Sequence, residues 1–310
     1  MLGAGRDSVH VVSSRWLILL LAGCGRVAFE PLEIDAAFDP CAAERADLGA
    51  FGIPQRIAVT STADVEDDPV LSPDGLEMYF ASNRTGSVGG EDIYVARRSS
   101  PADPWTTIDL VPLLSSNAND NTPAMSSDGL EMWVVSARAG GPGNEDIWVS
   151  VRSSTTAPWP APVLVNELSS TAQERGPAPY ADDLRMVFHS TRPGGSGGTD
   201  FWESTRTSRG TAWTPPVLLS SVNTAGSELH PWLSPCGLRM FFQADRGGLG
   251  GMDFFVVERA AVTDAFGPER RLDDLSTLDY DQDIHVSRDL RHVVFSSDVS
   301  GDGELYEASR

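Results

Sequence analysis

The chain has 310 residues, of which 41% are hydrophobic, enough to bury a substantial core, and this argues against a disordered protein. It carries 44 acidic and 23 basic residues, all of the latter arginine, for a net charge of −21. A surface of this sign repels a phosphate backbone, so nucleic acid is excluded as a partner. The 29 glycines, the 21 prolines and the short apolar runs between them are typical of an all-β chain.

The amino-terminal segment has the pattern of an export signal. Arg6 and Arg15 precede a short apolar run at residues 16–21. This run is too short to cross a bilayer core of about 30 Å as a helix, which distinguishes a signal peptide from a membrane span. We therefore predict a signal peptide over residues 1–23, and the residues at its end indicate the lipoprotein type.

Residues 21–24 read Leu-Ala-Gly-Cys, which resembles the lipobox of bacterial lipoproteins. In that motif the cysteine thiol receives diacylglycerol, so we predict a mature chain that begins at Cys24 and is held at the membrane by acyl chains. The alternative is an ordinary signal peptide with an incidental cysteine. Because Gly25 stands where an aspartate would favour the inner membrane, the expected location is the outer membrane of a bacterial envelope. Residues 24–50 are acidic and aperiodic, and we interpret them as a tether.

A unit of about 54 residues then recurs five times from residue 51 to residue 310. Each copy contains a turn that enters an apolar strand, a glycine-rich loop before a second strand, an aromatic residue before a third and an acidic residue before a fourth. The turn is complete as Ser-Pro-Asp-Gly at residues 72–75. The leucine of this turn recurs as Leu76, Leu130, Leu184, Leu238 and Leu290, and the aromatic residue as Phe51, Trp105, Trp159, Trp213 and Phe266.

Four short strands per copy cannot bury both faces of their sheet alone, and blades packed around a channel solve this problem while leaving few edges. We predict an all-β fold: a five-bladed β-propeller over residues 51–310, with four antiparallel strands per blade. Because the chain begins with an outermost strand, residues 51–59 are expected to pair with residues 304–310 and close the ring. We call the face of the Pro-Asp-Gly turns the bottom, where the tether enters, and the face of the glycine-rich loops the top, which is expected to point away from the membrane.

The turn at residues 72–75 resembles the WD-repeat-like, Pro-Asp-Gly type of propeller repeat seen in the carboxy-terminal domain of TolB and in many bacterial envelope lipoproteins. The resemblance covers residues 51–310. It implies a propeller in the cell envelope. The third and fifth copies lack the glycine of the turn, and the WD dipeptide itself is absent.

One column of like charge recurs in all five copies, at the expected top mouth of the channel. Its functional interpretation is a site for Ca²⁺ or a cationic ligand, because Ca²⁺ prefers hard oxygen ligands. The structural alternative is that each carboxylate caps backbone N–H groups or a neighbouring blade's loop. The column consists of Glu66, Asp120, Glu174, Glu228 and Asp281.

Departures from the repeat mark places where chemistry specific to one blade would occur. Near the acidic column they are Asp68, Arg175, His230, Asp283 and His285. Tyr180 and Trp232, on the innermost strands, either line the channel or belong to the core. Arg84, Arg138, Arg192 and Arg246 are expected to clasp the acids that end the glycine-rich loops, Asp92, Asp146, Asp200 and Asp253.

Two cysteines remain after lipidation, Cys41 and Cys236, and both lie toward the bottom of the predicted propeller. The ten residues from Cys41 to Phe51 reach up to about 33 Å, so a disulfide between the two cysteines is geometrically open in an oxidising compartment. Two free thiols are the alternative.

These observations favour a non-enzymatic envelope lipoprotein that presents its propeller as a binding scaffold for a protein or an envelope glycan. The competing class is a glycosidase-like hydrolase that uses carboxylates at the channel mouth. Against it, the acids repeat in every blade, whereas catalysis needs carboxylates in distinct environments that separate their pKa values. No cofactor is indicated apart from the Ca²⁺ considered above.

Overall fold

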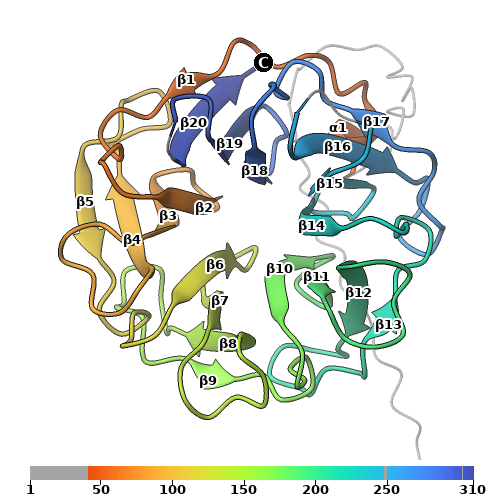
Figure 1. Ribbon diagram of the computed structural model, residues 1–310, viewed down its shortest axis with the longest axis horizontal. Coiled ribbons are helices and arrows are strands. Elements are labelled where there is room, and N and C mark those ends of the chain that lie inside the picture. The colour runs from red at the N-terminus through yellow and green to blue at the C-terminus, as the bar shows by residue number, and fades with distance from the viewer. Residues whose placement is uncertain (1–40, 248–249, 302) are drawn as a thin grey trace, which may run out of the picture. The chain divides into compact units, whose positions relative to one another are not determined.

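Five four-stranded antiparallel sheets surround a central channel in the computed structural model (Figure 1). The structure describes residues 41–247, 250–301 and 303–310. The predicted all-β fold, a five-bladed β-propeller, is confirmed. The predicted signal peptide, the lipidation site Cys24 and the tether up to residue 40 lie outside the described residues. Within the described ranges, no helix has the length and hydrophobicity required to cross a bilayer.

Four blades follow the chain outward from the channel, as expected of successive strands joined by short turns. The first contains β2 (Glu66–Leu71), β3 (Glu77–Ser82), β4 (Asp92–Arg97) and β5 (Thr107–Leu110), and the second contains β6 (Asp120–Met125), β7 (Glu131–Ser136), β8 (Asp146–Val151) and β9 (Val163–Leu164). The third contains β10 (Glu174–Tyr180), β11 (Arg185–Ser190), β12 (Asp200–Thr205) and β13 (Val217–Leu218), and the fourth contains β14 (Glu228–Leu233), β15 (Arg239–Ala244), β16 (Asp253–Glu258) and β17 (Arg270–Arg271).

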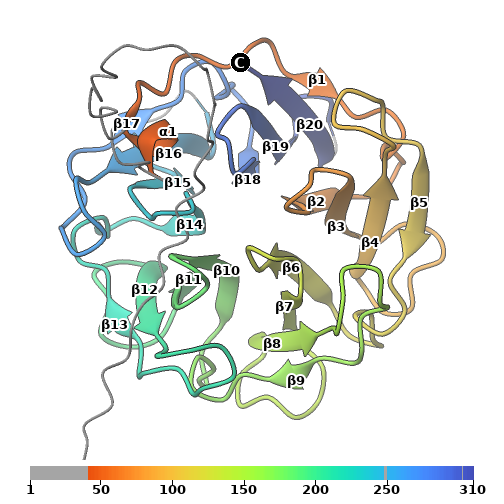
Figure 2. The same ribbon diagram turned by 180° about the vertical axis from the view of Figure 1, so that it is seen from behind.

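The fifth blade is assembled from both ends of the propeller sequence, which confirms the predicted closure. Its inner strands are β18 (Asp281–Val286), β19 (His292–Ser297) and β20 (Glu304–Ser309), and its outer strand is β1 (Gln55–Arg56). In the antiparallel pairing Gln55 lies opposite Glu307 and Arg56 opposite Tyr306. Both views place β1 alongside β20 at the rim (Figures 1 and 2). The ring is therefore closed by hydrogen bonds between distant segments of one chain.

The recurring aromatic residues fill the spaces between neighbouring blades. Trp159 is buried, and its indole N–H donates to the Tyr79 hydroxyl of the preceding blade at 3.0 Å. The Arg152 guanidinium stacks 4.0 Å from the Trp159 ring centroid, and its Nε donates to the Gly129 carbonyl at 2.8 Å. This stacked arginine, which the sequence analysis did not identify, recurs as Arg98, Arg152, Arg206, Arg259 and Arg310. Each one joins an aromatic residue to a bottom turn, so these arginines stabilise the blade packing.

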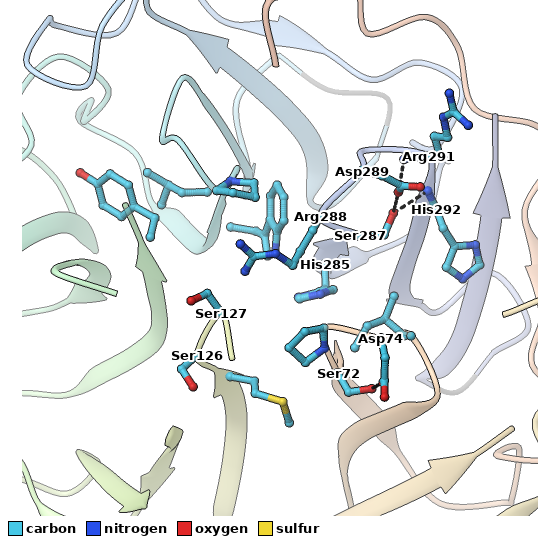
Figure 3. Close-up of a pocket in the computed structure, with 18 of the residues that line it drawn as sticks. Ser72, Asp74, Ser126, Ser127, His285, Ser287, Arg288, Asp289, Arg291 and His292 are labelled. Carbon is cyan, nitrogen blue, oxygen red and sulfur yellow. Dashed lines mark hydrogen bonds between the residues drawn. The ribbon is translucent and has the colours of Figure 1, made fainter. Parts of the chain in front are cut away.

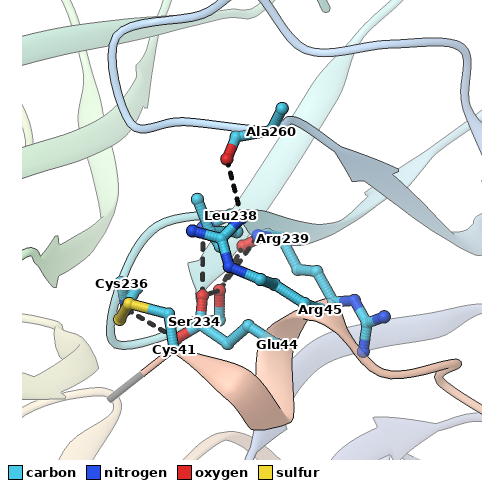
Figure 4. Close-up of a disulfide and its surroundings, with 8 residues drawn as sticks. All are labelled: Cys41, Glu44, Arg45, Ser234, Cys236, Leu238, Arg239 and Ala260. Atoms are coloured by element: carbon cyan, nitrogen blue, oxygen red, sulfur yellow. Dashed lines mark hydrogen bonds between the residues drawn. A yellow bond between two sulfur atoms is a disulfide. The ribbon is translucent and has the colours of Figure 1, made fainter. Parts of the chain in front are cut away.

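Residues 41–50 pack against the fourth blade, so the predicted boundary between tether and propeller at residue 51 is too late. They begin with a short helix, α1 (Ala42–Arg45). The buried Glu44 carboxylate accepts hydrogen bonds from the Ser234 hydroxyl at 2.5 Å and from the Leu238 backbone N–H at 3.1 Å (Figure 4). Leu48 is buried in the core. The acidic composition concealed this packing because the charge of Glu44 is satisfied by a turn of the fourth blade.

A disulfide fastens the start of this segment. Cys41 is bonded to Cys236 in the bottom turn between β14 and β15 (Figure 4). The Cys236 backbone N–H also donates to the Glu44 carboxylate at 2.6 Å. The chain therefore reaches the propeller at the bottom of blade four before it continues to β1.

Candidate functional site

The five acids of the predicted top column are fully buried at the start of the innermost strands. Glu174 accepts the Ser170 backbone N–H at 2.7 Å, the Ser170 hydroxyl at 2.5 Å and the Ser190 hydroxyl at 3.0 Å. The same bond from the backbone N–H four residues earlier recurs at Glu66, Asp120, Glu228 and Asp281. This is the geometry of the structural alternative, in which each carboxylate caps the loop before its own strand.

Arginines neutralise four of these acids, and this corrects the predicted clasp. Arg192 pairs with Glu174 at 3.0 Å and not with Asp200. Asp200 instead accepts backbone N–H groups of its own glycine-rich loop, from Ser196 at 3.0 Å and Gly197 at 3.2 Å. The equivalent pairs are Arg84 with Glu66, Arg138 with Asp120 and Arg246 with Glu228.

The fifth acid, Asp281, lacks such an arginine because Val299 stands at the equivalent position. Its carboxylate accepts the hydroxyls of Thr277 at 3.2 Å and Ser297 at 2.8 Å. Burial raises the pKa of the Asp281 carboxyl above its usual value. None of the five acids lines the channel cavities described below.

A ring of β-bulges narrows the channel two residues beyond each buried acid. The pairing of the innermost strand with its neighbour shifts register at this point in every blade. All five residues have left-handed backbone, with φ between 39° and 61°, but only one of them is glycine. Backbone of this kind in other residues costs of order 1–3 kcal/mol each and is concentrated at functional sites. The ring consists of Asp68, Thr122, Gly176, His230 and Asp283.

Three residues of this bulge ring converge on one another across the channel. Nδ1 of His230 lies 3.3 Å from an oxygen of Asp68 and in contact with an oxygen of Asp283. The His230 ring stacks on His189, with centroids 4.8 Å apart, and its backbone N–H donates to Nδ1 of His189 at 3.0 Å. Burial lowers the pKa of His230 to about 3 and raises that of Asp68 well above its usual value.

The structure thus brings together three of the five predicted asymmetric candidates, Asp68, His230 and Asp283. Arg175 lines the same cavity of about 250 Å³ at the top mouth and pairs with Glu145 at 3.0 Å. His285 lines the bottom cavity and also borders the small central channel cavity that Asp68, His230 and Asp283 line.

The bottom mouth opens into a larger cavity of about 470 Å³. Its floor includes Trp232, whose ring meets His285 edge to face with centroids 5.7 Å apart, and the apolar side chains of Leu71 and Met125. Figure 3 shows His285 and Arg288 pointing into this space. Arg288 is exposed and has no hydrogen-bond or ion-pair partner among the described residues. The cavity therefore combines an apolar aromatic floor with a free cation.

Carboxylates on the rim of the bottom cavity accept hydrogen bonds from residues of its turns. Asp74 accepts the Ser72 hydroxyl at 2.6 Å, and Asp289 accepts the Ser287 hydroxyl at 2.6 Å. Asp183 accepts the backbone N–H of Ser127 at 2.9 Å. The bonds of Asp74 and Asp289 lie within Pro-Asp-Gly type turns, and the bond of Asp183 joins the turns of two neighbouring blades, so these acids hold the walls of the cavity in place.

Arg288 and Met125 line the bottom cavity and His189 lines the top one, and none of the three was predicted from the sequence. Tyr180 belongs to a core cluster and also borders the bottom cavity, and Trp232 is half-buried, packs against the core and lines the same cavity, so each residue has both of the predicted roles. Arg288 carried a signal, because it is the arginine that replaces the proline of the Ser-Pro-Asp-Gly turn in the fifth copy.

No protein-family model and no curated protein matches this chain. Among solved structures it is similar to TolB from Acinetobacter baumannii, with 16% identity and a TM-score of 0.50 over 81% of this chain and 55% of that chain. It is also similar to an endo-arabinase from Bacteroides thetaiotaomicron, with 11% identity and a TM-score of 0.54 over 84% of this chain and 98% of that one. This chain thus spans about half the length of the TolB structure. At these identities the likeness shows the propeller fold alone, which binding proteins and glycosidases share.

Proposed function

We propose that the chain is an exported, lipid-anchored envelope protein whose propeller binds a segment of another envelope protein in the bottom cavity. The observation that carries the proposal is the combination of the Trp232 and His285 floor with the unpaired guanidinium of Arg288 above it. Pockets with an apolar aromatic lining and a few convergent polar groups are typical binding sites. Anchoring at the outer membrane rests on the lipobox that ends at Cys24.

The lining favours a peptide segment with apolar side chains and a carboxylate. Leu71 and Met125 add aliphatic surface beside Trp232, and a thioether adapts to irregular side chains. Arg288 offers a planar guanidinium that binds a carboxylate with two parallel hydrogen bonds. An envelope glycan is the second candidate ligand, because the face of Trp232 suits a sugar ring.

A propeller hydrolase is supported less well by this geometry. The acids proposed for it, among them Glu174, are fully buried and saturated by capping hydrogen bonds and arginines. The bottom rim carboxylates Asp74 and Asp289 are held in turns. A catalytic pair needs carboxylates that reach the substrate in two different environments.

The test places a photo-crosslinking residue at Met125, identifies the partner captured in intact cells, and measures its affinity for the purified full-length protein. Trp232→Ala and Arg288→Glu are each expected to weaken binding about 10- to 100-fold, as central aromatic and arginine contacts do. Arg270→Glu is the matched control, because Arg270 is equally exposed but lies on the outer strand β17.

Two results would count against the proposed function. One is unchanged affinity in both cavity variants. The other is turnover of aryl glycosides by the wild-type protein, which would favour the hydrolase instead.

A further inference from the structure

We propose that Asp68, His230 and Asp283 form a binding site for one divalent transition-metal ion, of the Zn²⁺ class, at the narrowest part of the channel. One imidazole nitrogen and two carboxylate oxygens of these residues lie within 4.8 Å of one another. They come from β2, β14 and β18, so three different blades contribute one ligand each. This site is independent of the bottom cavity and goes beyond the binding function proposed above.

The contacts within the cluster are not hydrogen bonds. Nδ1 of His230 faces Oδ1 of Asp68 and Oδ1 of Asp283, but neither contact has hydrogen-bond geometry. Asp283 is only 7% exposed, and its Oδ1 is buried without a hydrogen-bond partner among the described residues. A buried carboxylate oxygen without a partner is costly. A cation bound among these three atoms would stabilise both carboxylate oxygens and the imidazole nitrogen.

The second oxygen of each carboxylate is already held in place. Oδ2 of Asp68 accepts the Thr122 backbone N–H at 3.0 Å, and Oδ2 of Asp283 accepts the Ser296 hydroxyl at 2.7 Å. Stacking on His189 fixes the His230 ring. Outer contacts of this kind orient metal ligands in proteins. They leave Oδ1 of each carboxylate and Nδ1 of the imidazole directed at a common point.

The donor set selects among cations. Ca²⁺ takes six to eight oxygen ligands, whereas an imidazole combined with carboxylates suits Zn²⁺ and related ions. Metal–ligand bonds of about 2.0–2.1 Å at tetrahedral angles place neighbouring ligand atoms about 3.3 Å apart. The distance between Nδ1 of His230 and Oδ1 of Asp68 is 3.3 Å, whereas Nδ1 and Oδ1 of Asp283 are in direct contact and would have to separate when an ion binds.

The channel supplies both an entry path and an open coordination position. The three residues line the top cavity and also the central channel cavity of about 80 Å³. The top cavity is lined by the carboxylates of Asp67 and Glu91 in addition to the ligands, and by one arginine, Arg175. Water or a ligand in the channel would complete a four-coordinate ion.

The test titrates Zn²⁺ into chelator-treated, full-length protein by calorimetry and records the melting temperature. The wild type is expected to bind one Zn²⁺ per chain and to melt at a higher temperature when loaded. Asp283→Asn and His230→Asn are each expected to lower the affinity at least about 100-fold, since loss of a mere outer contact already costs 10- to 100-fold. Asparagine is chosen because it tolerates left-handed backbone at both positions.

His292→Asn is the matched control, because it removes a histidine that lines neither the top cavity nor the central channel cavity, and it should bind Zn²⁺ as the wild type does. The proposal is overturned if the wild type binds no Zn²⁺ at 1 mM, a concentration about 1000-fold above a micromolar Kd. It is also overturned if both asparagine variants retain wild-type affinity, or if Ca²⁺ binds more tightly than Zn²⁺. If one variant does not fold, the titrations of the other variant and of the wild type still show whether these residues bind Zn²⁺.

Discussion

Replacing Glu174 by alanine is expected to lower the free energy of unfolding by about 3–5 kcal/mol, the usual cost of removing one partner from a buried ion pair. The Arg192 guanidinium, 12% exposed, would lose its only carboxylate among the described contacts. The Ser170 N–H and the Ser190 hydroxyl would lose their acceptor as well. Urea unfolding followed by circular dichroism measures the change.

Asp109→Ala is the control for this experiment. Asp109 also pairs with an arginine, Arg97, at 2.6 Å, but the two side chains are 64% and 44% exposed. Exposed pairs contribute about 0–1 kcal/mol, so this variant should remain close to the wild type. A comparable loss in both variants would show that the capped carboxylate of Glu174 is no more important than a surface charge.

Removing the disulfide by Cys41→Ser and Cys236→Ser together is expected to cost about 3–5 kcal/mol. The bond closes a loop across a sequence separation of 195 residues, and loops of this length are expensive to close in the unfolded chain. The expected result is a clear fall in the urea midpoint. A mass increase of about two protons per chain on reduction would show that the bond exists in the purified protein.

The wild type in its reduced form provides the matched comparison, because it has the same sequence and differs only in the bond. It should unfold at the same urea concentration as the double serine variant. Equal midpoints for the oxidised and reduced wild type would contradict the expected contribution of the disulfide.

The repeat register was sufficient to predict the blade count and the closure of the ring. Leu76 and its four counterparts recur in step with the turns, so every blade could be aligned on the next. The pairing of β1 with β20 followed because the chain begins with an outermost strand and the last blade lacks one. These are properties of strand order, which a periodic sequence displays directly.

The partner of each arginine was not predictable from spacing. In the first blade, Ser82 lies opposite Glu66 on one side and opposite Asp92 on the other, so Arg84 is close to both acids by register. What decides between them is the glycine-rich loop, whose Gly89 N–H donates to Asp92 at 3.1 Å and leaves Glu66 for Arg84. That competition depends on loop conformation.

The cluster of Asp68, His230 and Asp283 could be predicted only in part from the sequence. Asp68, His230 and Asp283 occupy one repeat column, two residues after the buried acid, and were noticed because they differ from blade to blade. Their convergence depends on the β-bulges, because the left-handed backbone of each bulge directs these side chains toward the same level of the channel. Glycine marks such backbone in sequence, but here it occurs only at Gly176, so the signal was absent from the other four blades.

The position of the Cys41–Cys236 bond would have a mechanical consequence under the proposed anchoring of the amino terminus at a membrane. Tension on the anchor would pass through the covalent link into the bottom of blade four, where α1 also grips the neighbouring turn. Strand β1, which has only two residues and closes the ring by pairing with β20, follows Cys41 of that disulfide in the chain. A force applied through the anchor would therefore act on the Cys41–Cys236 disulfide and not on the β1–β20 pairing that closes the propeller.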